Sequence, residues 1–179
     1  RLRDDYQGDP LIPTHFAPHA PYSVSVETRT RVRRLADELE LPVAIHLHET
    51  SEEIAHSLQR HGKRPLARLA GLGLASPMLV AVHMTQVAPE AIDTLAEAGA
   101  SVVHCPESNL KLGSGVCPLP DLLDRGVRVG LGTDGAASNN DLDLLSEART
   151  AGLLSSGLSA GPGRVAAGDL LRLATLEGA

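Results

Sequence analysis

Aromatic residues are almost absent from this 179-residue chain, which contains no Trp, two Tyr and one Phe. We therefore expect a core built from Leu, Val, Ile and Ala, since apolar residues still make up 42% of the chain. Cysteine is also scarce, because Cys105 and Cys117 are too few for a disulfide framework and are not spaced as a C-x-x-C metal site. Reduced cysteines in a cytoplasmic protein are the simplest interpretation.

The chain also lacks an excess of positive charge and long apolar runs. Sixteen basic and 22 acidic residues give a formal charge of −6, which argues against a nucleic-acid-binding surface. A basic cluster at 29–34 lies near Asp37 and Glu38, and we interpret it as the solvated face of a helix. No run approaches the roughly 18 apolar residues of a membrane-spanning helix, so no membrane partner is expected. No signal peptide opens the chain.

Both ends of the chain have the character of cut ends. The first residue is Arg1 rather than Met, and the last helical pattern stops abruptly at Ala179. We therefore expect a fragment, in which a signal sequence could precede the first residue.

One pattern recurs along the chain: a short apolar run ends in a polar residue, and a helical stretch follows. The predicted strands are 11–17, 42–47, 78–82, 100–103 and 127–131, and the polar residues that end them are His19, His46, His83, His104 and Asp134. Because these runs are apolar throughout, we expect parallel strands that are buried on both faces.

Apolar spacing predicts helices between the strands. Thr50 and Glu53 form a candidate capping box, and Pro89 is suited to a first helical turn. Gly99 and Gly126 each stand where a helix ends. The helices are marked by Val32, Leu35, Ala36 and Leu39; by Ile54, Ala55 and Leu58; by Ile92, Leu95 and Ala96; by Leu142, Leu145 and Ala148; and by 165–176, which follows a loop at 161–163.

Two α/β architectures fit this alternation, a doubly wound open sheet and a (β/α)8 barrel of the TIM type. A doubly wound dinucleotide fold has a glycine-rich turn after its first strand, which is lacking here. In a barrel, catalytic side chains stand at the carboxyl ends of several strands, as the four His and one Asp do here. A whole barrel has eight strands, so we predict a partial (β/α)8 barrel of roughly the last five units, with 1–179 as a single incomplete domain.

His46 and Glu49 form the first candidate pair, in the segment His46-Leu47-His48-Glu49-Thr50. A neutral imidazole is a good ligand for a divalent metal, and a carboxylate three residues later could shuttle protons above it. A lone His at a strand end would more simply bond to the backbone. Because four His and Asp134 occupy matched places, we favour a site.

Asp134 lies in Gly132-Thr133-Asp134-Gly135, where the glycines permit a tight turn over the strand end. An Asp here could bind a metal and accept a proton from water. The alternative is a helix cap or an Asx-turn, but the following run 138–141 already supplies caps.

The other histidines carry weaker signals. His83 could be a metal ligand or a hydrogen-bond donor to a developing oxyanion. His104 is as well explained by packing behind the site as by a direct role. We expect His48 to point away from the metal, and His15, His56 and His61 to be structural or solvated.

Taken together, the motifs resemble the amidohydrolase superfamily, in its branch of aminohydrolases and chlorohydrolases. Within that branch they are most similar to deaminases of 5-methylthioadenosine and S-adenosylhomocysteine. The segments that carry the resemblance are Pro18-His19-Ala20-Pro21-Tyr22, His46-Leu47-His48-Glu49-Thr50, Val82-His83-Met84-Thr85, 108–115 and 132–140. The last two are specific signals, whereas the short His motifs are weak alone.

The resemblance implies hydrolytic deamination of a purine nucleoside by a site that holds one Zn²⁺, or another divalent metal such as Fe²⁺. His46 and Asp134 would be metal ligands, and His19 would bind the substrate near its sugar. Glu49 would contact the purine and move protons, and Asp134 would accept the proton of the attacking water. His83 would polarise the nucleophile or the attacked carbon. The resemblance leaves homo-oligomerisation open.

The chain departs from the family in one respect: no His-x-His pair ends a first barrel strand ahead of the motifs. The His-x-His at His46 and His48 stands on a strand that should supply a single ligand. The C-terminal strands of the family's small β-sandwich are also missing. Two alternatives therefore stay open: an enzyme of the same branch that acts on guanine, cytosine or a triazine, and a non-catalytic half-barrel.

Overall fold

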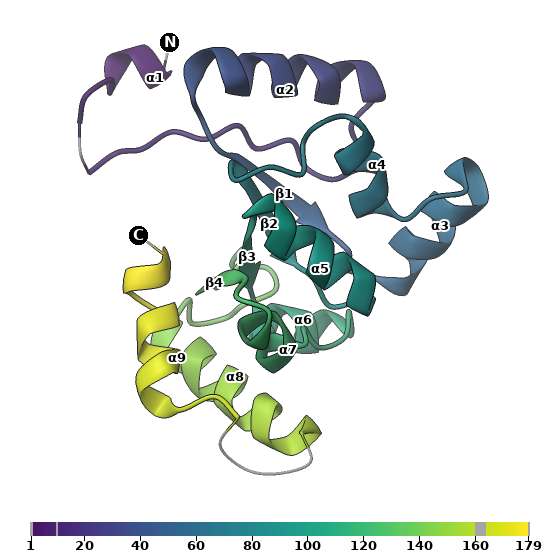
Figure 1. Cartoon of the computed structure of the whole chain (residues 1–179). Coiled ribbons are helices and arrows are strands. Elements are labelled where there is room, and N and C mark those ends of the chain that lie inside the picture. Colours follow the sequence, from purple (N-terminus) through teal and green to yellow (C-terminus); the bar gives the residue numbers. More distant parts are fainter. Residues whose placement is uncertain (1, 10, 160–163, 179) are drawn as a thin grey trace.

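The computed structural model describes residues 2–9, 11–159 and 164–178 and contains a parallel sheet (Figure 1). Its strands are β1 (Val43–Leu47), β2 (Leu79–His83), β3 (Ser101–His104) and β4 (Arg128–Leu131). The spatial order β1-β2-β3-β4 is the order along the chain. A doubly wound sheet reverses its direction at a switch point, whereas strands of a barrel follow one another around it. The topology is therefore that of a barrel segment, as predicted.

The predicted strand at 11–17 is wrong as a regular strand. Only Phe16 forms a ladder bridge, with the first residue of β1. The segment nevertheless continues beside β1, because the amide of His46 donates to the carbonyl of His19 over 3.1 Å. Pro18 interrupts the run, since proline has no N–H to donate to a ladder.

Helices connect and cover the strands, at the top, right and bottom of Figure 1, while both termini lie on its left. The helices predicted from apolar spacing are present, except that Leu142 precedes its helix with a φ of +54°. Four short helices, at 2–5, 65–71, 106–112 and 119–124, were not predicted. The helices are α1 (Leu2–Asp5), α2 (Val26–Leu39), α3 (Ser51–His61), α4 (Pro65–Gly71), α5 (Pro89–Ala98), α6 (Pro106–Leu112), α7 (Leu119–Asp124), α8 (Leu144–Leu158) and α9 (Ala167–Leu173), followed by a 3-10 turn, η1 (Leu176–Gly178).

The last predicted helix, 165–176, is only partly helical: α9 covers 167–173, and the last residue of the predicted range, Leu176, begins η1. The predicted loop at 161–163 lies outside the described residues. In the part of the chain that the structure describes, no helix is both long and apolar enough to cross a membrane.

The caps predicted for α3 and α5 are confirmed with one change, whereas α8 is capped by Asp143 and not by the predicted run 138–141. The Thr50 hydroxyl accepts from the Glu53 amide over 3.1 Å at the start of α3. The Glu53 carboxylate, however, accepts from the amide of Glu49 over 2.8 Å instead of from Thr50. Pro89 opens α5 and Gly99 closes it with a positive φ of 64°. The shifted bond fixes the backbone at a residue of the candidate site.

β1, β2 and β3 are buried on alternate residues, which corrects the expectation of two buried faces for these strands, whereas β4 is buried at three consecutive residues, 129–131. In β1 and β2, side chains such as Ile45 and Leu79 pack into the core under the helices, while Ala44, His46 and Val82 are half-buried. Burial of apolar area contributes about 25 cal/mol per Å² on the helix side. The half-buried side is the one that a complete barrel would enclose, and we call it the inner face.

The basic cluster on α2 is only partly a solvated face. Arg33 pairs with Asp37, and Arg34 pairs with Glu38 over 3.5 Å, as expected for i, i+4 pairs on an exposed helix. Arg29 contradicts the prediction, because its side chain is only 1% exposed. It faces the interior because it lies one turn after the Ser25 cap, where α2 approaches α3 and α4.

Candidate active site

His46 is held in a defined orientation on the inner face of the sheet. Its Nδ1 lies 2.8 Å from the carbonyl oxygen of His19. A carbonyl only accepts, so Nδ1 carries the hydrogen and Nε2 keeps its lone pair. Backbone carbonyls fix metal-binding imidazoles in this way, and the bond therefore suits His46 as a metal ligand.

His83 reaches the same region through an unusual backbone. Strand alternation would turn it to the helix side with Leu79 and Ala81, but its φ is +81°. Its ring stacks on that of His46 with centroids 5.2 Å apart. A non-glycine residue at positive φ costs free energy, and such residues concentrate at functional sites. The backbone turn brings two histidines from neighbouring strands together.

The protonation of His83 follows from its partner. Its Nδ1 lies 2.9 Å from Oδ1 of Asn109, which can only accept, so Nδ1 carries the hydrogen. Burial lowers the pKa of His83, although Glu49, Asn109 and Asp134 oppose this shift. The neutral ring therefore directs the lone pair of Nε2 toward Glu49.

Glu49 stands next to His83, with its Oε2 3.8 Å from Nε2 of the ring. Its Oε1 lies 3.5 Å from the Ser114 hydroxyl. Its backbone is fixed on both sides, because Glu53 accepts from its amide and the Thr85 hydroxyl donates to its carbonyl over 2.5 Å. The carboxylate thus keeps one oxygen near an imidazole and the other near a hydroxyl.

Asp134 follows β4 with a φ of +61°, and three donors hold its carboxylate. The Ser108 hydroxyl donates to Oδ2 over 2.6 Å, the Ser138 hydroxyl donates to Oδ2 over 3.1 Å, and the Gly135 amide donates to Oδ1 over 2.7 Å. Burial acts to raise the pKa of Asp134, but these bonds and His83 outweigh it and the pKa is lowered. The group is therefore ionised at neutral pH, as a metal ligand must be.

Behind Asp134 lies a buried carboxylate that the sequence did not single out. Glu147 in α8 is fully buried, accepts from the Glu107 amide over 3.1 Å and accepts from the side-chain amide of Asn139. Glu107 precedes Ser108, and Asn139 follows Ser138, so one side chain ties together both segments that hold Asp134. Burial raises the pKa of Glu147 to about 7.

The remaining strand-end histidines pack on the helix side. His104 is 1% exposed on the face of Val102, and burial lowers its pKa to about 3. This answers the question that the sequence left open, because His104 is a packed neutral side chain. His48 also points away from the inner face, as expected, and its Nε2 accepts from the Leu66 amide over 3.1 Å at the start of α4.

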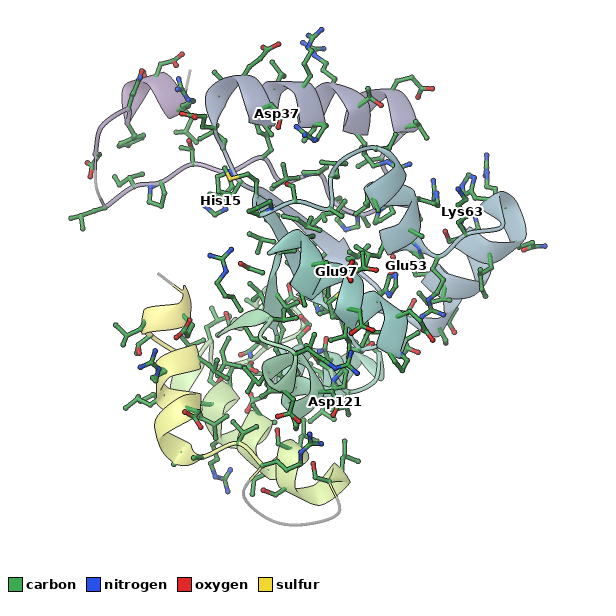
Figure 2. All side chains as sticks on the ribbon, viewed as in Figure 1. His15, Asp37, Glu53, Lys63, Glu97 and Asp121 are labelled. Atoms are coloured by element: carbon green, nitrogen blue, oxygen red, sulfur yellow. The ribbon has the colours of Figure 1, made fainter. Side chains whose placement is uncertain are left out.

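His19 joins the site from the segment beside β1. Its ring centroid lies 5.0 Å from that of His46, and its Nδ1 lies 2.7 Å from the Ser23 hydroxyl. The other three histidines are exposed and lie elsewhere: His15 stands beside the amino end of β1 (Figure 2), and His56 and His61 are on α3.

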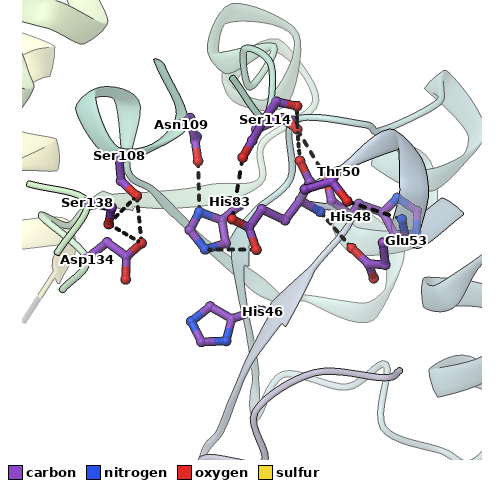
Figure 3. A network of polar contacts seen from close by, with 12 residues as sticks. His46, His48, Thr50, Glu53, His83, Ser108, Asn109, Ser114, Asp134 and Ser138 are labelled. Atoms are coloured by element: carbon purple, nitrogen blue, oxygen red, sulfur yellow. Dashed lines mark hydrogen bonds and ion pairs between the residues drawn. The ribbon is translucent and has the colours of Figure 1, made fainter. Parts of the chain in front are cut away.

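The predicted metal ligands are a partial set. His46 and Asp134 both stand at the carboxyl ends of the strands (Figure 3), but no group of three His, Cys, Asp or Glu that could hold a metal occurs within the described residues. An imidazole with a fixed tautomer and an ionised carboxylate fit a zinc ion, which takes four ligands as a rule. The residues present therefore fit part of a metal site.

Comparison with known proteins identifies the family. Residues 5–179 match the amidohydrolase family. The chain belongs to this family.

Curated relatives carry the name 5-methylthioadenosine/S-adenosylhomocysteine deaminase. The protein of that name from Teredinibacter turnerae is 50% identical over all of this chain, and that from Pyrococcus furiosus is 45% identical over 94% of it. This amidohydrolase chain spans about 40% of the length of the relatives it matches.

Solved structures of amidohydrolases have the same fold. An adenosine deaminase from Xanthomonas campestris with bound zinc has a TM-score of 0.96 and 53% identity, over 99% of this chain and 40% of that one. An atrazine chlorohydrolase variant from Arthrobacter aurescens, with zinc and atraton, has a TM-score of 0.91 and 27% identity, over 98% of this chain and 40% of that one.

Proposed function

We propose that the whole protein containing this chain is a zinc-dependent deaminase of adenine nucleosides such as 5-methylthioadenosine or S-adenosylhomocysteine. The observation that carries the proposal is the convergence of His46, Glu49, His83 and Asp134 at the carboxyl ends of the strands. The 50% identity to a deaminase supports the choice of reaction.

In this proposal, His46 and Asp134 hold the metal together with ligands from the rest of the protein. When bound, zinc lowers the pKa of water and so supplies a nucleophile at neutral pH. The Nδ1 bond of His46 to the His19 carbonyl keeps Nε2 directed to the inner face.

Glu49 and His83 take part in proton transfer. Glu49 protonates the ring nitrogen next to the carbon that bears the amino group, which makes that carbon more electrophilic. His83 lies 3.8 Å from Glu49 through Nε2, close enough for a small shift to share the proton between them. Asn109 keeps the other nitrogen protonated, so that Nε2 is the atom directed at the reaction.

Asp134 accepts the proton of the attacking water and passes it toward the leaving ammonia. Its lowered pKa keeps the carboxylate ionised until the water arrives, while the hydroxyls of Ser108 and Ser138 fix the orientation of Oδ2. His19 binds the substrate near its sugar, from its exposed position beside His46.

The test uses the full-length protein loaded with zinc and follows ammonia release from methylthioadenosine. We expect Glu49→Gln and Asp134→Asn to lower kcat/KM by roughly 10²- to 10⁴-fold, since each removes a proton-transfer group. Glu52 is an exposed carboxylate in the first turn of α3, three residues after Glu49. Glu52→Gln is therefore the matched control and should keep wild-type turnover. Wild-type rates in either site variant would show that these roles are assigned to the wrong residues.

A second candidate is hydrolysis of a ring substituent other than an amino group, as the similarity to an atrazine chlorohydrolase suggests. The same purified protein assayed with a chlorotriazine distinguishes the two. Release of chloride without release of ammonia from adenine nucleosides would favour this candidate.

A further inference from the structure

A positively charged cleft lies on the helical side of the molecule, and one end of it reaches Ser23, whose hydroxyl contacts His19 of the candidate active site. It is bordered by the Val26 end of α2, by α3 and by α4, which lie on the same side in Figure 1, and its volume is about 300 Å³. Arg29, Arg60 and Arg68 line it together with His56 and His61, and none of its described lining residues is acidic.

Arg29 is the unusual member of this group. Its side chain is 1% exposed, and its Nε donates to the Ser25 carbonyl over 3.4 Å. Its Nη1 is buried without a hydrogen-bond partner among the described residues. A buried guanidinium stays charged, and leaving one of its donors unpaired is costly. This arrangement is expected where a ligand completes the bonding.

The protein does not neutralise this charge within its described part. No ion pair involves Arg29, Arg60 or Arg68 there, and Arg68 has only a long bond of 3.4 Å to the Ser57 hydroxyl. Burial, and then the charge of Arg68, lower the pKa of Arg29. Glu27 opposes that shift, but it is exposed on the first turn of α2.

We propose that this cleft binds a small oxyanion of the phosphate class, with Arg29 as its principal ligand. Guanidinium groups offer paired N–H donors that match the oxygens of phosphate. The positive end of the 14-residue helix α2 adds to the same potential, because Ser25 and Val26 line the cleft. The arginines of the cleft lie on helices rather than at the strand ends, although Ser23 links the cleft to His19, and the proposal does not depend on the proposed deaminase reaction.

The experiment is calorimetric titration of the full-length protein with inorganic phosphate, at constant ionic strength maintained with chloride. We expect one phosphate to bind per chain and the unfolding temperature to rise with phosphate concentration. Arg29→Met and Arg68→Met should each weaken binding at least about tenfold, because each removes a charged hydrogen-bond donor. Arg31→Met, an exposed arginine of α2 outside the cleft, is the matched control and should bind as the wild type does.

Stability without phosphate gives a second readout. Arg29→Met should unfold at the wild-type temperature or above it, because it replaces an unpaired buried charge by an apolar side chain. If that variant fails to fold, Arg68→Met carries the affinity test. The proposal is overturned if phosphate neither binds to the wild-type protein nor raises its unfolding temperature, as when a carboxylate of the protein fills the cleft. It is equally overturned if both cleft variants bind phosphate like the Arg31 control, as when the anion binds at the metal.

Discussion

At the scale of single residues, His46 and His48 show how position in a strand decides a role. The two form a His-x-His sequence, yet His46 has its Nε2 free at the inner face, and His48 caps α4 through the Leu66 amide. Burial lowers the pKa of His48 to about 4, so it stays neutral and remains an acceptor. One is suited to bind a metal and the other to stabilise the fold.

Substitution separates these roles. In the full-length protein, His48→Ala should lower the free energy of unfolding by about 1–3 kcal/mol, because it leaves the buried Leu66 amide without an acceptor. Its zinc content and kcat should stay at the wild-type level. His46→Ala should instead lose zinc with little loss of fold, measured by metal analysis and denaturant unfolding. Loss of zinc in the His48 variant would contradict this division.

At the scale of elements, Glu147 links α8 to two segments that end near Asp134. It accepts from the Glu107 amide in α6 and from the Asn139 side chain in the loop after β4. Burial is the main cause that raises its pKa from 4.5 to about 7, and the charges of Glu107 and Asp141 add to the effect. The junction of three elements therefore contains a titratable group near neutral pH.

This group makes stability depend on pH in a defined direction. Below about pH 4.5, Glu147 is protonated in both the folded and the unfolded chain. Between there and about pH 7, only the folded chain keeps the proton, so the stability contributed by Glu147 falls as the pH rises, by at most about 1.4 kcal/mol per unit. Glu147→Gln cannot titrate.

We therefore expect Glu147→Gln to become more stable relative to the wild type between pH 5 and pH 7.5, measured by urea unfolding of both proteins. Both proteins contain the same other titratable groups, so their contributions cancel in the difference between the two free energies of unfolding at each pH. A difference that is constant with pH, or that changes in the opposite direction, would show that Glu147 does not carry the proton.

At the scale of the whole molecule, we propose that residues 1–179 are one incomplete barrel domain. The sheet is open, with β4 at one edge and β1 paired at the other only with the irregular segment that contains Phe16 and His19, and its inner face is only half-buried. An unpaired strand edge is a site of association with other chains. The chain also spans about 40% of the length of its relatives and contains two of the predicted metal ligands.

The 179-residue chain expressed alone should therefore bind zinc below one ion per chain and release no ammonia from methylthioadenosine. Two ligands hold zinc far less tightly than four. Metal analysis after dialysis and a coupled ammonia assay measure both properties. Stoichiometric zinc together with turnover would prove the isolated chain to be a complete enzyme.

The sequence by itself determined the class of fold and the chemistry of the strand ends. Alternation of apolar runs with helical spacing is local, and it predicted the parallel sheet and most of its helices. The residue types at the strand ends, from His46 to Asp134, are equally readable, since each follows its run at a fixed place. The motifs also identified the amidohydrolase family, which the comparisons confirm.

Only the tertiary structure decided which way these side chains point and what holds them. A period of two gives directions in a regular strand, but the positive φ of His83 reverses its face, while His104 keeps the regular one. The hydroxyl of Ser108 reaches Asp134 from 26 residues away, a contact that no local pattern encodes. Arg29 resembles its exposed neighbours in sequence, and its burial depends on where α2 meets α3 and α4. Local spacing fixes which residues are present, whereas packing between distant segments fixes their environment.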